Sequence, residues 1–219
     1  MRGISRITGR EVCLAVSAAA AAGYLLVQRW QPVPGGALLK GVPVGSLAVL
    51  ALLARGIRRD AALLALGLAF STAGDVLLDL DPDYFVFGLG AFLLTHLIYV
   101  GLFARNRAAG IHLDPPHLAA LLLVLAYSAT LSAWIVPSVG ALGVPVVFYI
   151  CAITTMVCTA ILARFTQRWV AVGAVLFLVS DSLLAIDKFK MPVPARDYLV
   201  WITYYAGQCG IALGYLESS

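Results

Sequence analysis

The sequence predicts an all-α polytopic membrane protein with eight transmembrane helices, and three observations predict it. The 219 residues are 62% hydrophobic and only 12% charged, whereas a soluble domain is about half apolar and a quarter charged. The mean hydropathy is +0.95. Eight apolar stretches reach, or nearly reach, the roughly 20 residues that a helix needs to cross a bilayer. β-Strands are not expected, because Ala and Leu dominate and no alternating pattern occurs.

The eight predicted helices are separated by short connections that contain helix-ending or charged residues. The first follows three arginines and continues well beyond its Ala cluster, which is long for a signal-peptide core, so an uncleaved helix is expected. QPVPGG, DPD, DPP and MPVP end or precede helices with Pro and Gly. No loop is long enough for a soluble domain, so residues 1–219 are expected to form a single bundle. The helices are predicted at 11–29, 37–54, 60–79, 84–104, 116–136, 143–163, 169–187 and 197–216.

The charges are distributed unequally between the two sets of connections. One set carries ten basic residues: Arg2, Arg6, Arg10, Arg55, Arg58, Arg59, Arg105, Arg107, Arg164 and Arg168. The other set carries Arg29, Lys188, Lys190 and Arg196, together with the acidic Asp79, Asp81 and Asp83. Because basic loops mark the cytoplasmic side, both termini are predicted to be cytoplasmic. The net charge of +4 forms no basic stripe, so nucleic acid is not an expected partner.

Two similar segments, FSTAGDVLLDLDPDY and FLVSDSLLAIDKF, lie about half the chain apart. Each places an aspartate late in an apolar helix, Asp75 in the third and Asp181 in the seventh. A Leu-rich turn and a second carboxylate, Asp79 or Asp187, follow. This pattern predicts a parallel 4+4 internal repeat around an axis along the membrane normal.

Polar residues within these spans are the candidate functional residues, because inserting an ionisable side chain costs roughly 3 kcal/mol or more. At a rise of about 1.5 Å per residue, Asp75, Asp181 and Tyr204 are expected about 7–9 Å from the non-cytoplasmic surface. His96 and Gln208 are expected about 16–18 Å deep. The sequence therefore predicts a polar funnel that opens on that side.

Two further polar residues extend the predicted funnel. Lys40 lies at its rim, near the start of the second helix. Tyr99 shares a face of the fourth helix with His96, because apolar, Gly and polar residues recur there every three or four positions. The residues of this face are Phe85, Gly88, Phe92, His96 and Tyr99.

Each candidate has a structural alternative. The two aspartates could instead join helices through hydrogen bonds worth about 1 kcal/mol each. His96 could be a satisfied core histidine, Tyr204 a packing residue, and Lys40 a lysine that extends to the interface. The three aspartates that follow Asp75 fit a solvated loop, although Asp79 lies one turn after Asp75 and could face the funnel.

A metal site or cofactor is not expected. His96 is the only histidine within a predicted span, whereas His112 and His117 lie in or beside a loop. The predicted spans therefore contain too few histidines for a metal site with two or three histidine ligands.

Four motifs, taken in their order and spacing, resemble the YhhN-type lysoplasmalogenase family: FSTAGDVLL at 70–78, FVFGLGAFLLTHLIY at 85–99, SDSLLA at 180–185 and YYAGQ at 204–208. The resemblance covers nearly the whole chain, including the number of spans. The family pattern has Pro directly after a lysine of the second helix, whereas Gly41 and Val42 separate Lys40 from Pro43 here. The resemblance implies an intramembrane hydrolase that cleaves the vinyl ether bond of lysoplasmalogens. The products would be a fatty aldehyde and glycerophosphoethanolamine or glycerophosphocholine.

The candidate residues suit this chemistry. A vinyl ether breaks when its β-carbon is protonated and water captures the resulting oxocarbenium ion, so one acid and one base are needed. Asp75 and Asp181 are the predicted catalytic pair, as in glycoside hydrolysis, with His96 assisting. The predicted substrate-binding residues are Lys40 for the phosphate, and Tyr99, Tyr204 and Gln208. The expected partners are a single-chain lysophospholipid and membrane lipid, with no obligate protein partner.

Two other classes fit parts of the pattern. Buried acids, a histidine and a parallel repeat also describe a proton-coupled transporter, although helices broken by Gly or Pro near the polar groups are absent. A structural membrane protein would use the aspartates for stability alone.

Overall fold

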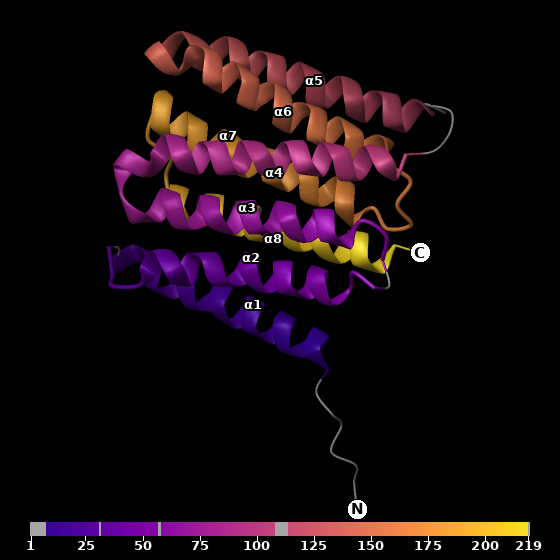
Figure 1. Cartoon of the computed structure of the whole chain (residues 1–219). Helices are drawn as coiled ribbons and strands as arrows, with labels where there is room; N and C mark the ends of the chain where they lie inside the picture. The colour runs from indigo at the N-terminus through magenta and orange to yellow at the C-terminus, as the bar shows by residue number, and fades with distance from the viewer. Residues whose placement is uncertain (1–7, 31, 57, 108–113, 219) are drawn as a thin grey trace, which may run out of the picture. The chain divides into compact units, whose positions relative to one another are not determined.

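The computed structural model describes residues 8–30, 32–56, 58–107 and 114–218, and these residues form eight long helices and no β-strand (Figure 1). Every helix end lies within two residues of its predicted position. The helices are α1 (Gly9–Val27), α2 (Gly36–Leu53), α3 (Ala61–Leu80), α4 (Phe85–Arg105), α5 (Pro115–Ile135), α6 (Gly143–Leu162), α7 (Trp169–Phe189) and α8 (Arg196–Glu217). The prediction of an all-α protein is confirmed.

Seven of the eight described helices are long and apolar enough to cross a membrane. The exception is α8, which is 22 residues long but carries Arg196, Asp197 and the polar run TYYAGQ. Large apolar side chains also cover the surface: Leu123 is 72% exposed and Phe148 is 65% exposed. Because a soluble protein would not present so many apolar side chains to water, the chain is a multi-pass membrane protein.

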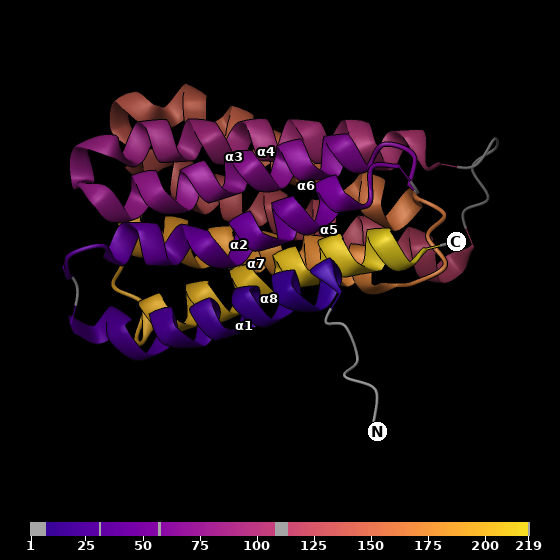
Figure 2. The same cartoon turned by 60° about the horizontal axis from the view of Figure 1, so that its bottom comes forward.

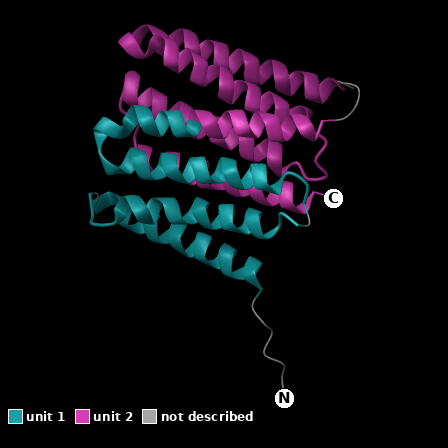
Figure 3. Cartoon of the chain, viewed as in Figure 1, with its two compact units in different colours: residues 1–92 teal, residues 93–219 magenta. Residues whose placement is uncertain are grey.

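The chain forms two compact units, residues 1–92 and residues 93–219 (Figure 3). The boundary falls within α4. In the first unit, α2 packs between α1 and α3, and in the second unit α5, α6, α7 and α8 pack in chain order. Figure 2 shows the antiparallel course of α7 and α8, which make the most extensive helix contact. The single bundle and the parallel repeat stay predictions.

Local sequence accounts for the beginnings of several helices. Thr8 and Glu11 form a capping box at the start of α1, in which each side chain accepts a hydrogen bond from the other residue's backbone N–H. Asp114 caps α5 by accepting from the N–H of His117, and two prolines fill the first turn. Gly35, at φ 77°, takes the left-handed conformation before α2 that favours glycine.

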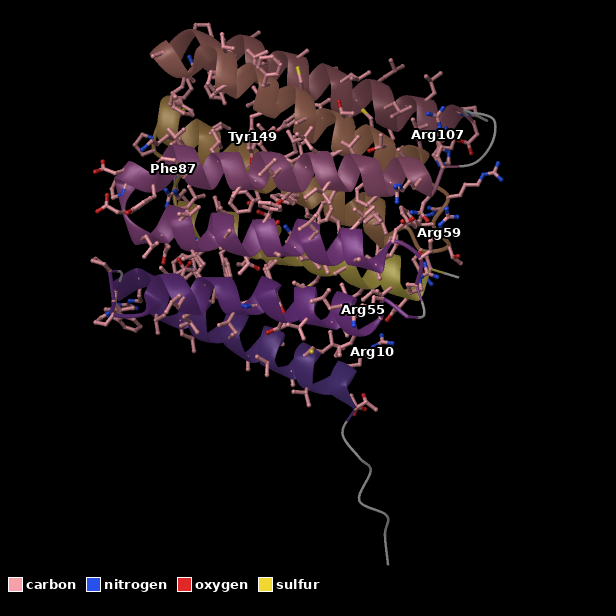
Figure 4. All side chains as sticks on the ribbon, viewed as in Figure 1. Arg10, Arg55, Arg59, Phe87, Arg107 and Tyr149 are labelled. Carbon is pink, nitrogen blue, oxygen red and sulfur yellow. The ribbon has the colours of Figure 1, made fainter. Side chains whose placement is uncertain are left out.

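The arginines that the sequence assigns to the more basic set of connections lie at one end of each unit. In the first unit, Arg10, Arg55 and Arg59 lie at the end opposite to Phe87 (Figure 4). In the second unit, Arg107 and Ala163 form a β-bridge, so the arginines that follow α4 and α6 share one end. The predicted separation of charge is therefore present within each unit, and the orientation of the termini stays a prediction. Arg2 and Arg6 lie outside the described residues.

Glycines allow α7 and α8 to approach with their backbones in contact. A Cβ on Gly173 would lie 2.5 Å from the carbonyl oxygen of Gly207 and 2.7 Å from the nitrogen of Ile211. A Cβ on Gly210 would lie 2.9 Å from the carbonyl oxygen of Trp169. Small residues promote such packing in membranes, where helices gain little from the hydrophobic effect. This contact fixes the position of Asp181 relative to α8.

We expect Gly173→Ala to reduce the free energy of unfolding by about 1–3 kcal/mol, because the new methyl group meets backbone atoms that cannot rotate away. The matched control is Gly101→Ala on α4, where an added Cβ has no neighbour within 4 Å. Thermal unfolding of the purified protein in detergent measures both. Equal melting temperatures for the two variants would contradict the close contact.

Candidate active site

A buried histidine, a tyrosine and an aspartate meet within the second unit. His96 Nε2 lies 3.0 Å from Tyr149 Oη and 3.2 Å from Asp181 Oδ2. Tyr149 O–H donates to the same Asp181 oxygen at 2.6 Å. His96 is fully buried, and the Asp181 side chain is 14% exposed. His96 was predicted to assist one of the two aspartates, and the structure places it in contact with Asp181; the catalytic roles stay predictions.

Three helices supply these side chains. His96 lies in α4, Tyr149 in α6 and Asp181 in α7. The ring of Phe177, one turn before Asp181, packs edge-on against His96 at 4.8 Å. The Tyr149 ring packs edge-on from another direction at 5.1 Å. The imidazole is thus held in one orientation by two rings and two oxygens.

Asp181 lies deeper than the sequence predicts. Helix α7 continues to Phe189, two residues beyond its predicted end, so Asp181 lies about 12 Å from the helix end. His96 lies about 16 Å from the start of α4. The difference is small enough for the side chains to bridge, which explains why two residues predicted at different depths are in contact.

One arrangement of protons satisfies the three contacts of this cluster. A tyrosine hydroxyl has one proton, and Tyr149 donates it to Asp181. His96 Nε2 must then carry a hydrogen to bond with the two oxygens. In the neutral imidazole, Nδ1 holds the lone pair, and it is buried without a hydrogen-bond partner among the described residues. The site therefore contains a buried proton acceptor whose opposite nitrogen is anchored to a carboxylate.

The other candidates of the second unit lie close by. Tyr99 O–H donates to Gln208 Oε1 at 2.9 Å, and both side chains are fully buried. Tyr204 packs edge-on against Phe177 at 5.3 Å. The structure thus places Tyr99 with Gln208, and connects Tyr204 to His96 through one aromatic ring.

Asp75 and Lys40 belong to the first unit. Asp75 is buried in α3. Phe92 packs against Gly74, the residue before Asp75, so closely that a Cβ on Gly74 would lie 2.6 Å from the Phe92 ring. Lys40 Nζ lies 3.3 Å from Asp79 Oδ1 in α3. Asp75 and Asp181 lie in different units, and their pairing stays a prediction.

Sequence reasoning missed Tyr149. Its position could have indicated it, because Tyr149 lies about 9 Å from the start of α6, similar to the predicted depth of Asp181. The interpretation of Asp79 as part of a solvated loop is wrong, because its side chain is only 15% exposed and bonds to Tyr24 and Lys40. Helix α3 continues to Leu80, which keeps Asp79 beside α1 and α2.

The fold and this site define a class: helical membrane proteins with a hydrogen-bonded His–Tyr–Asp cluster among apolar helices. Residues 35–215 match the YhhN family, and the chain belongs to that family. The prediction of family membership is confirmed. No solved structure matches the chain.

Relatives from bacteria and mammals carry one activity name. The chain is 39% identical to the lysoplasmalogenase of Mycobacterium bovis over 83% of this chain and 72% of the relative. It is 35% identical to lysoplasmalogenase TMEM86A of Bos taurus over 83% of this chain and 78% of the relative. It is 32% identical to lysoplasmalogenase TMEM86B of Sus scrofa over 86% and 78%. These names agree with the prediction of a hydrolase.

We expect Tyr149→Phe to reduce the free energy of unfolding by about 1–2 kcal/mol, because the hydroxyl joins α4, α6 and α7. Tyr127→Phe on α5, whose side chain is 40% exposed, is the matched control. The double variant with Asp181→Asn should lose less than the sum of the single losses, because both changes disrupt one hydrogen bond. Additive losses in thermal unfolding would show that the cluster is not a coupled unit.

Proposed function

We propose that the protein is an intramembrane lysoplasmalogenase, which hydrolyses the vinyl ether bond of a single-chain alkenyl lysophospholipid. The products are a fatty aldehyde and a glycerophospho-alcohol. Family membership and the names of the relatives support the reaction. The observation that carries the proposal is the buried His96, whose Nε2 is bonded to Tyr149 and Asp181 and whose Nδ1 is unpartnered among the described residues.

The unpartnered Nδ1 suits the base of this reaction. After the β-carbon gains a proton, the oxocarbenium ion needs a water molecule and a group that accepts one of its protons. We assign this proton to His96 Nδ1. Asp181 then stabilises the imidazolium through Nε2, as an aspartate does in hydrolytic triads. Tyr149 fixes the carboxylate orientation by donating to Oδ2. The hemiacetal collapses when His96 returns the proton to the departing glycerol oxygen.

The first step requires a carboxylic acid that protonates the β-carbon. The two-carboxylate hypothesis leaves open which aspartate is the acid. Because Asp181 is bonded to His96, we assign this role to Asp75, which is buried within α3. When the hemiacetal collapses, its hydroxyl proton returns to this carboxylate, so the reaction adds one water and leaves the protein unchanged. The role of Asp75 rests on the sequence pattern and on its burial.

The remaining candidates are assigned to substrate binding. Tyr99, Tyr204 and Gln208 belong to the same unit as His96. Lys40 is assigned to the substrate phosphate. Apolar helices suit an alkenyl chain that enters from the bilayer, because its transfer from lipid costs little. We also propose that both termini lie in the cytoplasm, since positive loops remain on that side.

We expect purified protein to release aldehyde from an alkenyl lysophospholipid and not from its saturated alkyl ether analogue, which cannot form the oxocarbenium ion by protonation. Asp181→Asn should lower kcat/KM about 100-fold or more, because the base loses its charged partner. Tyr149→Phe should lower it about tenfold, the effect of one hydrogen bond to a charged group. A coupled aldehyde dehydrogenase assay measures all four rates.

The matched control for Asp181→Asn is Asp187→Asn, on the same helix but in an ion pair with Arg196 at the α7–α8 turn. This control should retain wild-type activity. If folded wild-type protein releases no aldehyde between pH 5 and 8, the proposal is refuted. Proton-gradient-dependent uptake into proteoliposomes would then support the transporter alternative.

We expect Asp75→Asn to lower the kcat of aldehyde release about 100-fold or more, with KM little changed, because an amide cannot supply the proton. Asp83→Asn, an exposed carboxylate after the same helix, is the control for the charge change. Melting temperatures establish that both variants are folded. Wild-type kcat in folded Asp75→Asn would refute the two-carboxylate mechanism and leave the His96 base intact.

A further inference from the structure

A second polar cluster lies within the first unit, at the end of three helices. Tyr24, near the end of α1, donates its hydroxyl to Asp79 Oδ1 at 2.9 Å. Lys40, near the start of α2, bonds to the same oxygen at 3.3 Å. The Lys40 ammonium also lies over the Tyr24 ring, 5.7 Å from its centre. Asp79 is the penultimate residue of α3, and because the end of a spanning helix is expected near the lipid headgroups, the cluster is expected at that depth.

A glycine brings this cluster together. A Cβ on Gly41, the residue after Lys40, would lie 2.8 Å from Val76 and 3.3 Å from Thr72 of α3. Only glycine allows α2 to approach α3 this closely beside Lys40.

The Asp79 carboxylate is used on one side only. Both donors bond to Oδ1, whereas Oδ2 is buried and has no hydrogen-bond partner among the described residues. Asp187 of α7 differs, because its Oδ1 accepts from the N–H of Val193 and its Oδ2 pairs with Arg196 at 3.2 Å. A buried carboxylate oxygen without a donor loses its hydration with nothing to replace it. The missing donor at Oδ2 points to a ligand.

We infer that Tyr24, Lys40 and Asp79 form a headgroup site that selects a phospholipid with a primary ammonium over one with a quaternary ammonium. Lys40 carries a positive charge for the phosphate, and Asp79 Oδ2 accepts a hydrogen bond from the ammonium. A phosphoethanolamine group has the complementary pair of charges. The side chains of Lys40 and Asp79 are 19% and 15% exposed. The terminal carboxylate torsion of an aspartate is broad, so a partial rotation brings Oδ2 toward a ligand while Oδ1 stays within reach of Tyr24 and Lys40.

A choline headgroup fits this site poorly. A quaternary ammonium has no N–H, so Asp79 Oδ2 would remain without a donor, and its three methyl groups would keep the charges apart. Quaternary ammonium ions are recognised by the faces of aromatic rings. The aromatic ring of this cluster, Tyr24, is already covered by the Lys40 ammonium.

This inference deepens the proposed function by naming the headgroup, and it is tested first by binding, which needs no reaction. Isothermal titration uses the saturated 1-alkyl lysophosphatidylethanolamine and lysophosphatidylcholine with the full chain in detergent. We expect about tenfold tighter binding of the ethanolamine lipid, the effect of one hydrogen bond to a charged group. Asp79→Asn should reduce this preference to about twofold or less, mainly by weakening the ethanolamine lipid.

Two variants separate the roles within the site. Lys40→Met should weaken both lipids, because both carry the phosphate. Asp83→Asn, which makes the same chemical change on an exposed residue after α3, should keep the wild-type preference. In the aldehyde assay, Asp79→Asn should raise KM for the alkenyl ethanolamine lipid and leave kcat unchanged, because the site binds the headgroup and not the reacting bond.

Equal affinity of the wild-type protein for the two lipids would overturn the inference, and this result does not depend on any variant. An equal loss for both lipids in folded Asp79→Asn would also overturn it, since the carboxylate would then only position Lys40. Aldehyde release without headgroup preference refutes the headgroup site alone. Headgroup preference without aldehyde release refutes the proposed reaction alone.

Discussion

The arrangement of the polar side chains follows from the cost of leaving a polar group unpaired among apolar helices. In an apolar environment each such group must find a partner or lose a free energy comparable to that of a hydrogen bond. Asp181 accepts from Tyr149, Gln208 accepts from Tyr99, and Asp79 accepts from Tyr24. A tyrosine is the donor in all three contacts. Its ring packs with apolar neighbours while its hydroxyl reaches a polar partner, so it connects polar groups across helices without adding a charge.

Two of the buried atoms that have no hydrogen-bond partner among the described residues belong to these clusters. His96 Nδ1 and Asp79 Oδ2 are both buried acceptors on side chains whose other polar atoms are satisfied. A purely structural role would be served equally well by side chains without the additional acceptor. In each side chain the bonded atom sets the orientation. The other atom can accept a proton or a hydrogen bond from a substrate.

The helices could be predicted from the sequence, and the contacts between them could not. Length, hydropathy and the Pro and Gly residues of the loops determined the helix ends to within two residues, because each signal is local. The contact between His96 and Asp181 depends on the rotation of α4 and α7, which depends on packing such as that of Gly173 against Gly207. Tyr149 was missed because one tyrosine in an apolar helix resembles a packing residue until its neighbours are known. Asp79 was interpreted as a solvated residue because its place at the end of a helix does not show that Tyr24 of α1 and Lys40 of α2 lie beside it.

The two aspartates of α3 show how one helix can serve both parts of the proposed reaction. Asp75 and Asp79 are four residues apart, so they lie on the same face, about 6 Å apart along the axis. Asp79 lies at the helix end with a lysine beside it, whereas Asp75 is buried one turn further in. A lysophospholipid has the same order along its length, with a charged headgroup first and the ether bond several bonds deeper. A headgroup bound at Asp79 would therefore direct its vinyl ether toward the level of Asp75. The spacing of one helical turn, which the FSTAGDVLLD segment carries in its sequence, matches the order of charge and bond in the proposed substrate.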